Sequence, residues 1–574
     1  MSSGERASSC ASRVLAVLAG FVAAGGAAAA QGPAVADLLF VGPIITMDPA
    51  APRAEAAAIR GGKILAVGTR ESVLRHRGRA TRVVELGEQA LLPGFIDTHG
   101  HLTATAASLR FADLSPAPVG SVGTIGELQE ALRRYIRARA IPPGAWVVGR
   151  GYDDAQLSER RHPTRNDLDA VSREHPIYIV HASGHLGAAN SPALERVRYS
   201  AETPDPAGGV IRRQAGSREP DGVLEETAHM AVFGQLPRAG LEESLAELPR
   251  ALAYYASFGL TTVQDGAAGP EALALLREAD RRGLLTLDVV AYRLWTPVGT
   301  SFPVDVQYGT YQGRVRLGGI KLMLDGSPQG KTAWLSQPYL VPPTGQPASY
   351  SGYPTLPPAV VTTAVTESLQ RNVPVIAHAN GDAAAEALID AVRAARAATG
   401  RPGPLVVMIH AQTVRDDQLD RMGALGMIPS FFTGHTFYWG DWHRDQTLGL
   451  PRAERISPAR SAIERGLAFT LHTDAPVVPP DMLRTLWSAT TRRTRSGDIL
   501  GPAQRIGTAE ALAGLTINAA RQYGEADRKG AIRPGLLADL VILSRDPLAV
   551  DPESLRDVQV VETISRGRTV HRAQ

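Results

Sequence analysis

Two histidines separated by one residue follow a short apolar run near residue 95. In the segment LLPGFIDTHGHL, His99 and His101 come directly after residues typical of a buried strand. Side chains two apart on a strand point to the same side, so both imidazoles can reach one metal ion. Taken alone the pair is a weak signal, because a single buried histidine is as often a core residue as a ligand.

Polar residues stand in several other apolar runs. His378 closes VPVIAH, His410 closes LVVMIH and Asp474 follows LAFTLHT, while Lys321 lies within GGIKLML. In a parallel barrel the carboxyl ends of the strands converge on one mouth, where active sites lie. Four histidines, a carboxylate and a lysine gathered there form a nitrogen- and oxygen-rich site suited to zinc.

The elements that must position these residues alternate between strand-like and helix-like patterns. Helical periodicity predicts helices over residues 270–281, 383–398 and 416–425. Alternation of this kind predicts an α/β fold with a (β/α)8 TIM barrel. The predicted strands are residues 90–97, 261–265, 287–293, 317–324, 373–377, 405–409, 427–431 and 467–473.

The gap between the first and second predicted strands is too long for an ordinary connection. We therefore expect an inserted subdomain at about residues 105–240 that covers one mouth of the barrel, which itself is expected over residues 91–524. Both ends of the chain are β-rich. Residues 31–90 and 525–574 are expected to form a small β-sandwich built from both termini.

Residues 1–30 have the pattern of a signal peptide. Arg6 and Arg13 are followed by an apolar run over residues 14–24 and by the small residues 28–30. The alternative is a membrane anchor, but the run falls short of the roughly 20 residues that span a bilayer. We therefore expect an exported protein, periplasmic or extracellular after cleavage.

The composition of the 574-residue chain is that of a globular protein, with 44% hydrophobic and 20% charged residues and a net charge of +3. A basic stripe that would indicate nucleic-acid binding is lacking. The single cysteine, Cys10, precedes the cleavage site, so the mature chain would have no thiolate. Any metal must then be bound by His, Lys, Asp or Glu.

The order His-x-His, Lys, His, His, Asp, framed by β-rich termini, resembles the amidohydrolase superfamily. More narrowly, the chain looks like amidohydrolase family 3, the group of YtcJ-like metal-dependent hydrolases. The resemblance extends from about residue 36 to the C-terminus. Its segments are PGFIDTHGHL, GRGYDD, SGHLGAANSPAL, DGVLEETA, TTVQDG, GGIKLMLDGS, HANGDAA, IHAQ, HTDAPV and GAIRPGLLADLVIL.

The resemblance implies a cofactor of one or two divalent metal ions, with zinc expected. His99 and His101 would bind the more buried ion, and His378 and His410 the second. Lys321, carboxylated by carbon dioxide, would bridge the two ions. A carbamate requires an uncharged amine, and burial lowers the pKa of a lysine.

The same resemblance implies hydrolysis of carbon–nitrogen bonds other than peptide bonds, in amides such as N-acyl or N-formyl small molecules. A metal ion lowers the pKa of its water from 15.7 towards about 7 and so provides hydroxide. Asp474 would contact the metal, take the proton and deliver it to the leaving amine. The sequence departs from the family pattern at two positions, where Ile409 replaces a common glutamate and Asn380 replaces an apolar residue. Neither change removes a ligand.

Further candidates lie near these motifs. His185, in SGHLGAANS, is a candidate catalytic donor to the substrate carbonyl or its oxyanion. His435 and Trp439, in FFTGHTFYWGDWH, are candidate substrate-binding residues, with simple packing as the alternative for all three. A supporting role is expected for His472 and a structural one for Glu226.

Two alternatives remain open for the function. Hydrolysis of an ester, a lactone or another carbonyl substrate would use the same hydroxide. A non-catalytic periplasmic binding protein on the same scaffold would have lost a ligand, and every ligand position here is filled. The expected partner is a small-molecule substrate, with no nucleic acid and no stable membrane anchor, and a homodimer is left open.

Overall fold

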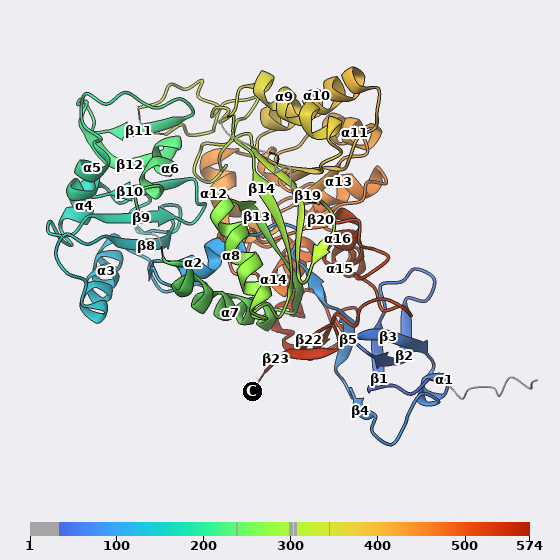
Figure 1. Ribbon diagram of the computed structural model, residues 1–574. Coiled ribbons are helices and arrows are strands. Elements are labelled where there is room, and N and C mark those ends of the chain that lie inside the picture. The colour runs from blue at the N-terminus through green and yellow to red at the C-terminus, as the bar shows by residue number, and fades with distance from the viewer. Residues whose placement is uncertain (1–33, 237–238, 298–301, 303–306, 344, 574) are drawn as a thin grey trace, which may run out of the picture.

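The computed structural model describes residues 34–573 apart from 237–238, 298–301, 303–306 and 344. It has an α/β fold with three β-sheets, of which one lies at the centre of the molecule and the other two at its sides (Figure 1). The signal peptide predicted for residues 1–30 lies outside the described residues.

The central sheet is curled and contains eight parallel strands, joined to one another in chain order. A short strand, β15 (Tyr311–Gln312), pairs antiparallel with one of them. Most residues of these strands are buried, as expected for parallel strands covered on both faces. The eight strands are β6 (Phe95–Ile96), β13 (Leu260–Ala268), β14 (Asp288–Leu294), β16 (Val315–Met323), β17 (Val375–Ala379), β18 (Val406–His410), β19 (Ile428–Phe431) and β20 (Thr470–Leu471).

Helices lie along the outside of the curled sheet (Figure 1). The three helices predicted from periodicity are present within about one residue, as α8 (Pro270–Arg281), α10 (Asp382–Thr399) and α11 (Asp416–Ala424). Among the described residues, no helix combines the length and apolar character needed to cross a bilayer. The other helices outside the predicted insertion are α1 (Arg70–Leu74), α2 (Leu102–Ser108), α7 (Leu241–Ser257), α9 (Pro358–Gln370), α12 (Gly434–Trp442), α13 (Ala459–Glu464), α14 (Met482–Thr491), α15 (Thr508–Leu515) and α16 (Ile517–Gln522).

The single strand predicted over residues 90–97 is wrong, because the structure divides it between two sheets. β5 (Ala90–Pro93) belongs to the sheet of the chain ends, whereas β6 (Phe95–Ile96) begins the curled sheet. Gly94 lies between them, and a Cβ atom there would be 2.3 Å from Thr261 Cγ2. A side chain at this position would therefore clash with Thr261, so glycine allows the close approach where the chain changes sheets.

The first and last strands of the curled sheet lie at its two ends, and no ladder joins β6 to β20 in the described part of the chain. The residues after these strands are nevertheless adjacent. Thr98 Oγ1 donates a 2.8 Å hydrogen bond to the Leu471 carbonyl. The Asp474 backbone N–H donates to the His99 carbonyl at 3.1 Å. The polar residues at the two ends of the sheet are thus brought together.

A six-stranded sheet forms within the range predicted as an insertion. Its strand order is β11-β12-β10-β9-β8-β7, and it lies at the left of Figure 1. Its strands are β7 (Ala112–Asp113), β8 (Val147–Tyr152), β9 (Ile177–His181), β10 (Leu186–Ala189), β11 (Gly209–Arg213) and β12 (Pro220–Glu226). The helices of this region are α3 (Ile125–Arg139), α4 (Arg165–Asp169), α5 (Ser191–Val197) and α6 (Thr227–Phe233).

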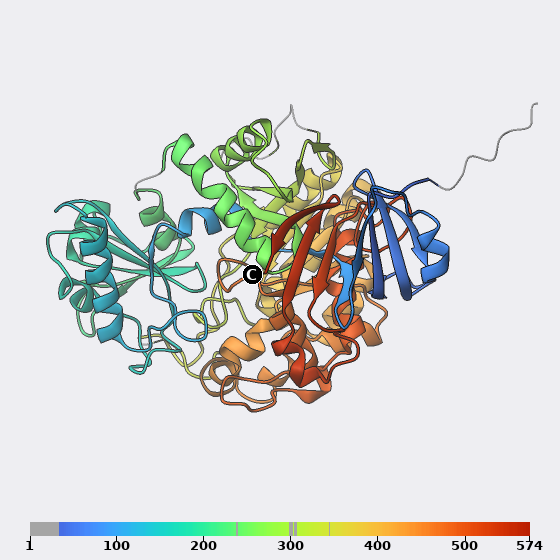
Figure 2. The ribbon, with the colours of Figure 1, turned by 90° about the horizontal axis from the view of Figure 1, so that it is seen from below.

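The two ends of the chain share one sheet, ordered β23-β22-β21-β5-β1-β2-β3, with β4 beside β1. Figure 2 shows the strands of the N-terminal end beside those of the C-terminal end. The predicted division of this sheet into a two-layered sandwich stays a prediction. The strands are β1 (Leu38–Ile45), β2 (Arg53–Arg60), β3 (Lys63–Gly68), β4 (Arg82–Glu85), β5, β21 (Leu540–Leu543), β22 (Val560–Ser565) and β23 (Arg568–Arg572).

A buried lysine ties the C-terminal segment to the curled sheet. Lys529 is 1% exposed, and its Nζ donates to Asp288 Oδ2 at 2.8 Å and to Thr262 Oγ1 at 2.9 Å. Its Nζ also lies 3.3 Å from Glu525 Oε2. Removing one partner of a buried ion pair leaves the other charges poorly compensated.

We expect the Lys529→Met substitution to lower the free energy of unfolding by about 3 kcal/mol. Urea-induced unfolding followed by tryptophan fluorescence would measure this change. The control is Lys63→Met, because Lys63 is exposed and its substitution should cost less than about 0.5 kcal/mol. Equal stability of the two variants would mean that the buried lysine does not hold the two parts together.

Candidate metal centre

The six residues predicted as metal ligands lie together where strands of the curled sheet end. All but His101 are at least nine-tenths buried, and Lys321 is only 1% exposed. Their places in the fold are His99 and His101 after β6, Lys321 in β16, His378 in β17, His410 at the end of β18 and Asp474 after β20.

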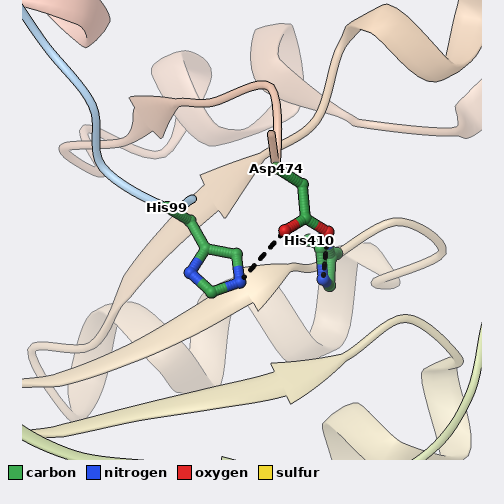
Figure 3. Close-up of side chains that lie close together, drawn as sticks. All are labelled: His99, His410 and Asp474. Atoms are coloured by element: carbon green, nitrogen blue, oxygen red, sulfur yellow. Dashed lines mark ion pairs between the residues drawn. The ribbon is translucent and has the colours of Figure 1, made fainter. Parts of the chain in front are cut away.

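The Asp474 carboxylate lies among three of the histidines. Its Oδ1 is 3.2 Å from His101 Nε2 and 3.5 Å from His99 Nε2, and its Oδ2 is 3.7 Å from His410 Nε2. Figure 3 shows His99 and His410 facing this carboxylate from different strands. One ligand atom from each of His99, His410 and Asp474 lies within 4.8 Å of the other two.

The remaining two residues extend the same cluster. Lys321 Nζ is 2.9 Å from His99 Nε2. His378 Nδ1 is 3.1 Å from His410 Nε2. Each of the six side chains therefore has a donor atom within 3.7 Å of a donor atom of another member of the cluster. This convergence at the strand ends is what the sequence predicts.

A glutamine that the sequence analysis did not single out fixes the orientation of His99. Gln264 Nε2 donates to the Thr98 carbonyl at 2.8 Å, which leaves Gln264 Oε1 as the acceptor for His99 Nδ1–H at 2.7 Å. With its proton on Nδ1, the His99 ring directs the lone pair of Nε2 towards Lys321 and Asp474. This is the tautomer that a metal ligand requires.

His378 is oriented in the same way by the segment after β16. Its Nε2 lies 3.0 Å from the Gly326 carbonyl, which can only accept a hydrogen bond, so Nδ1 keeps its lone pair towards His410. Asn380 donates to the same carbonyl at 2.9 Å. Asp325, which the sequence analysis also missed, lies with Oδ1 3.5 Å from His378 Nε2.

The backbone at two of these residues is strained. His410 has φ = 72° and Asp474 has φ = 58°, in the left-handed region that side chains other than glycine rarely adopt. Such conformations cost on the order of 1–3 kcal/mol each and are concentrated at functional sites. They aim the two side chains into the cluster from the ends of their strands.

The protonation states suit a divalent cation. Burial lowers the pKa of Lys321 to about 7, so much of the amine is uncharged at neutral pH. Burial, followed by the nearby Lys321 amine, holds the pKa of His99 well below its usual range. Burial opposes ionisation of Asp474, but the nearby His101 imidazole keeps the pKa of this carboxyl below its ordinary value.

The donor set therefore fits a metal ion. Asp474 Oδ1 is buried and has no hydrogen-bond partner among the described residues, although three imidazoles surround the carboxylate. A buried carboxylate oxygen normally has such a partner. Nitrogen and oxygen donors that converge in this way are the ligand types that zinc prefers.

We expect the Gln264→Leu substitution to weaken metal binding about 10- to 100-fold, because the tautomer of His99 would no longer be fixed. Competition with a chromogenic chelator would measure the affinity. The matched control is Gln522→Leu, since Gln522 Nε2 also donates to the Thr98 carbonyl, at 2.9 Å, but the residue has no recorded contact with His99. Equal affinity in both variants would contradict the role assigned to Gln264.

The predicted catalytic donor His185 lies beside the cluster. Its ring centroid is 4.8 Å from that of His378, and its Nδ1 is 2.8 Å from Glu226 Oε2. Although burial acts against it, the Glu226 carboxylate raises the pKa of His185. Glu226 therefore orients the His185 ring, which is a structural role. His472 Nε2 lies 3.1 Å from Nδ1 of His410, one of the candidate ligands.

A cavity of about 260 Å³ is lined by Ala475, the residue after Asp474, and by Asp113 and Arg150 of the six-stranded sheet. Trp439 lines it, together with Tyr438 and Ala475. His435 is not among its lining residues. Its ring packs against Trp439, with centroids 4.7 Å apart, and its Nδ1 is 3.1 Å from His443 Nε2. The two predicted substrate-binding residues therefore differ, since Trp439 faces the cavity and His435 lies behind it.

A sequence profile described as "Amidohydrolase family" matches residues 82–571 of the chain. The chain belongs to this family. It is therefore an enzyme, a hydrolase of the amidohydrolase family, rather than the non-catalytic binding protein left open above. The resemblance inferred from the motifs is confirmed.

Individual proteins are similar to the chain over nearly its whole length. An N-substituted formamide deformylase of Arthrobacter pascens is 28% identical over 550 residues, covering 92% of this chain and 97% of the relative. The putative amidohydrolase YtcJ of Bacillus subtilis is 26% identical over 553 residues, covering 92% and 98%. A solved metal-dependent hydrolase from Pyrococcus horikoshii has a TM-score of 0.68 and 25% identity, covering 90% and 99%.

Proposed function

We propose that this amidohydrolase is metal-dependent and hydrolyses carbon–nitrogen bonds other than peptide bonds in N-acyl or N-formyl small molecules. The observation that carries the proposal is the cluster of four imidazoles, an amine and a carboxylate, in which each side chain has a donor atom 2.9–3.7 Å from a donor atom of a neighbour. The Arthrobacter relative, named as a formamide deformylase, supports the substrate class. The Pyrococcus protein, described as a metal-dependent hydrolase, supports the cofactor.

Two divalent ions, with zinc as the proposed element, fit the donor atoms. His99 and His101 would hold one ion, His378 and His410 the other, and a carboxylated Lys321 would lie between them. When bound, such an ion lowers the pKa of water towards about 7 and polarises a carbonyl. The lowered pKa of Lys321 supports its carboxylation, because only the uncharged amine reacts with carbon dioxide.

The side chains of the chain itself move the protons. Asp474, whose pKa is held below its ordinary value, directly precedes Ala475, a lining residue of the cavity, so it can accept a proton at Oδ1 or Oδ2 and return it to the leaving amine nitrogen. An amide has a poor leaving group, which makes this return essential. His185, oriented by Glu226, would donate a hydrogen bond from Nε2 to the substrate carbonyl oxygen. Trp439 would bind the substrate in the cavity.

We further propose how the molecule is organised. Hydrogen bonds between the residues after β6 and β20 support closure of the curled sheet into a (β/α)8 barrel. The proposed divisions are a barrel over residues 91–524 with an insertion at about 105–240, and a sandwich formed by residues 31–90 and 525–574. We also propose cleavage of residues 1–30 on export to the periplasm or the exterior, and leave a homodimer as a question for sedimentation.

The test is a substrate screen with the zinc-loaded protein. N-formyl, N-acyl and cyclic amides would be compared with esters and lactones, with released amine or acid as the readout. We expect amides to be turned over, and the activity to disappear with a chelator and to return with zinc. Turnover of esters or lactones alone would show that the enzyme cleaves carbon–oxygen bonds and not the proposed carbon–nitrogen bonds. Activity unaffected by chelation would overturn the metal dependence.

A further inference from the structure

A second group of side chains that could bind a metal ion lies in the six-stranded sheet and shares no residue with the cluster around Asp474. Asp153 and Asp154 come directly after β8, and His181 is the last residue of β9. These two strands are parallel neighbours in the sheet, and Tyr152 stands opposite His181 in their register. The three side chains therefore come from the same end of two adjacent strands.

The donor atoms of these three residues converge. His181 Nε2 lies 3.1 Å from Asp154 Oδ1 and 3.7 Å from Asp153 Oδ1. One ligand atom from each residue lies within 4.8 Å of the other two, as is true of the three residues drawn in Figure 3. All three residues are more than nine-tenths buried. Imidazole nitrogen and carboxylate oxygen are both ligands for zinc and related divalent ions.

Two of these donor atoms lack the hydrogen bonds that buried polar atoms normally make. Asp154 Oδ1 and His181 Nε2 are buried, and neither has a hydrogen-bond partner within the described part of the chain. They are 3.1 Å apart, so their mutual orientation is not that of a hydrogen bond. Asp474 Oδ1 shares this property in the main cluster. A cation bound between the two atoms would satisfy both.

The charges around the two carboxylates leave room for a cation at short range. Within the described ranges, neither Asp153 nor Asp154 forms an ion pair with a lysine or an arginine. Their close neighbours are His181 and His162, whose Nε2 lies 3.5 Å from Asp154 Oδ2. Three cationic side chains act on these carboxylates from beyond ion-pair distance, namely Arg212, Lys331 and Arg495. A divalent ion would meet both carboxylates much more closely.

The His181 ring is held so that Nε2 faces the carboxylates. Its Nδ1 accepts a hydrogen bond from the Ser183 backbone N–H at 3.1 Å and lies 2.8 Å from Ser183 Oγ. In the metal-free ring Nε2 therefore carries the proton, which a bound cation would replace. Ser183 Oγ can then accept a hydrogen bond from Nδ1–H, and this is the tautomer that a metal ligand requires.

Asp153 connects this group to the cavity. It lines the cavity together with Ala182 and Trp439, so an ion could enter from there. Its Oδ2 accepts a 2.6 Å hydrogen bond from Trp439 Nε1 of α12, and its Oδ1 accepts one from the Ala155 backbone at 3.0 Å. An ion bound to Oδ1 would fix the carboxylate that joins the six-stranded sheet to α12.

We propose that Asp153, Asp154 and His181 bind a divalent transition-metal ion, with zinc as the probe, at a structural site separate from the main cluster. The ion holds the six-stranded sheet against α12 at the wall of the cavity. This inference is independent of the proposed function, because no step of amide hydrolysis uses these residues.

His181→Gln is expected to remove about one equivalent of bound metal per chain. The full chain is loaded with zinc alone and desalted, and its metal content is measured by mass spectrometry. The matched control is His175→Gln, another buried histidine of the same region, whose Nδ1 lies 2.8 Å from Ser172 Oγ and whose Nε2 lies 3.1 Å from the Ile141 carbonyl. This variant should keep its full content. The difference does not depend on how many ions the main cluster holds, and equal content in all three proteins would overturn the site.

A second measurement keeps the proposal testable even if His181→Gln does not fold. In crystals of the unsubstituted protein grown with zinc, anomalous density is expected roughly 2.0–2.2 Å from Asp153 Oδ1, Asp154 Oδ1 and His181 Nε2. A lack of density at this position would contradict the proposal.

Hydrogen exchange tests the structural role of the ion. The backbone of α12 should exchange faster in His181→Gln than in His175→Gln, because the carboxylate that binds Trp439 is no longer fixed. Unchanged exchange in a variant that has lost its metal would show that the ion does not hold α12 in place.

Discussion

Replacing Asp474 with asparagine is expected to lower kcat/KM about 1,000-fold while the protein keeps its metal. Asparagine retains an oxygen donor, and the four histidines and Lys321 are unchanged, so the ions should remain bound. What the variant loses is the ability to accept a proton and return it to the leaving amine, and such transfer contributes roughly 10²–10⁴-fold. Steady-state kinetics on an amide substrate, with metal content by mass spectrometry, would measure both effects.

The two readouts exclude different explanations. If activity and metal content fall together, Asp474 is a ligand whose loss dismantles the site, and its role as proton carrier is unsupported. If activity stays within about 3-fold of the unsubstituted enzyme, another group carries the proton. An ester with a good leaving group should lose less activity than an amide, because its leaving group needs no proton.

The Lys321→Ala substitution is expected to reduce bound metal below half of the normal content and kcat/KM by on the order of 10³-fold, because it removes the residue proposed to lie between the two ions and its share of the activation of the attacking water. The variant also creates a small buried space next to His99. Formate or acetate added at high concentration should enter this space, supply a carboxylate in place of the carbamate and restore part of the activity.

Lys331→Ala is the control for this experiment. Lys331 is a partly buried lysine whose ammonium lies over the Trp442 ring, 5.2 Å from its centroid, with no recorded contact to the cluster. We expect it to keep its metal and its activity. Full metal content in Lys321→Ala would show that the lysine is not a ligand, and failure of every small carboxylate to rescue the variant would count against carboxylation.

Much of the fold could be predicted because its signals are local. The periodicity of residues 270–281 predicts α8 at the bounds that the structure gives. The strand predicted over residues 90–97 fails for the opposite reason. After Gly94 the chain leaves its pairing with β21 and pairs with the distant β13, and local sequence does not reveal this change of partner.

The candidate site likewise contains residues that the sequence could predict and residues that it could not. His378 and His410 stand at the ends of apolar runs, so their convergence follows from strand geometry alone. Gln264 and Asp325 also lie at such ends, in TTVQDG and LMLDGS, yet their types are common there and carry no distinct signal. Gln264 Oε1 lies 2.7 Å from His99 Nδ1, and Asp325 Oδ1 lies 3.5 Å from His378 Nε2. Which ring nitrogen each residue approaches depends on the three-dimensional fold, so the sequence alone does not reveal these roles.

The hydrogen bonds between the residues that follow the first and last parallel strands have a consequence for how the enzyme matures. His99 and Asp474 are separated by most of the chain but are joined by the 3.1 Å backbone hydrogen bond after β6 and β20. A growing polypeptide therefore has no complete ligand set until its last parallel strand has been added. On the proposed ligand set, high-affinity uptake of the metal would be among the final events of folding, and premature capture by a partly synthesised chain would be disfavoured.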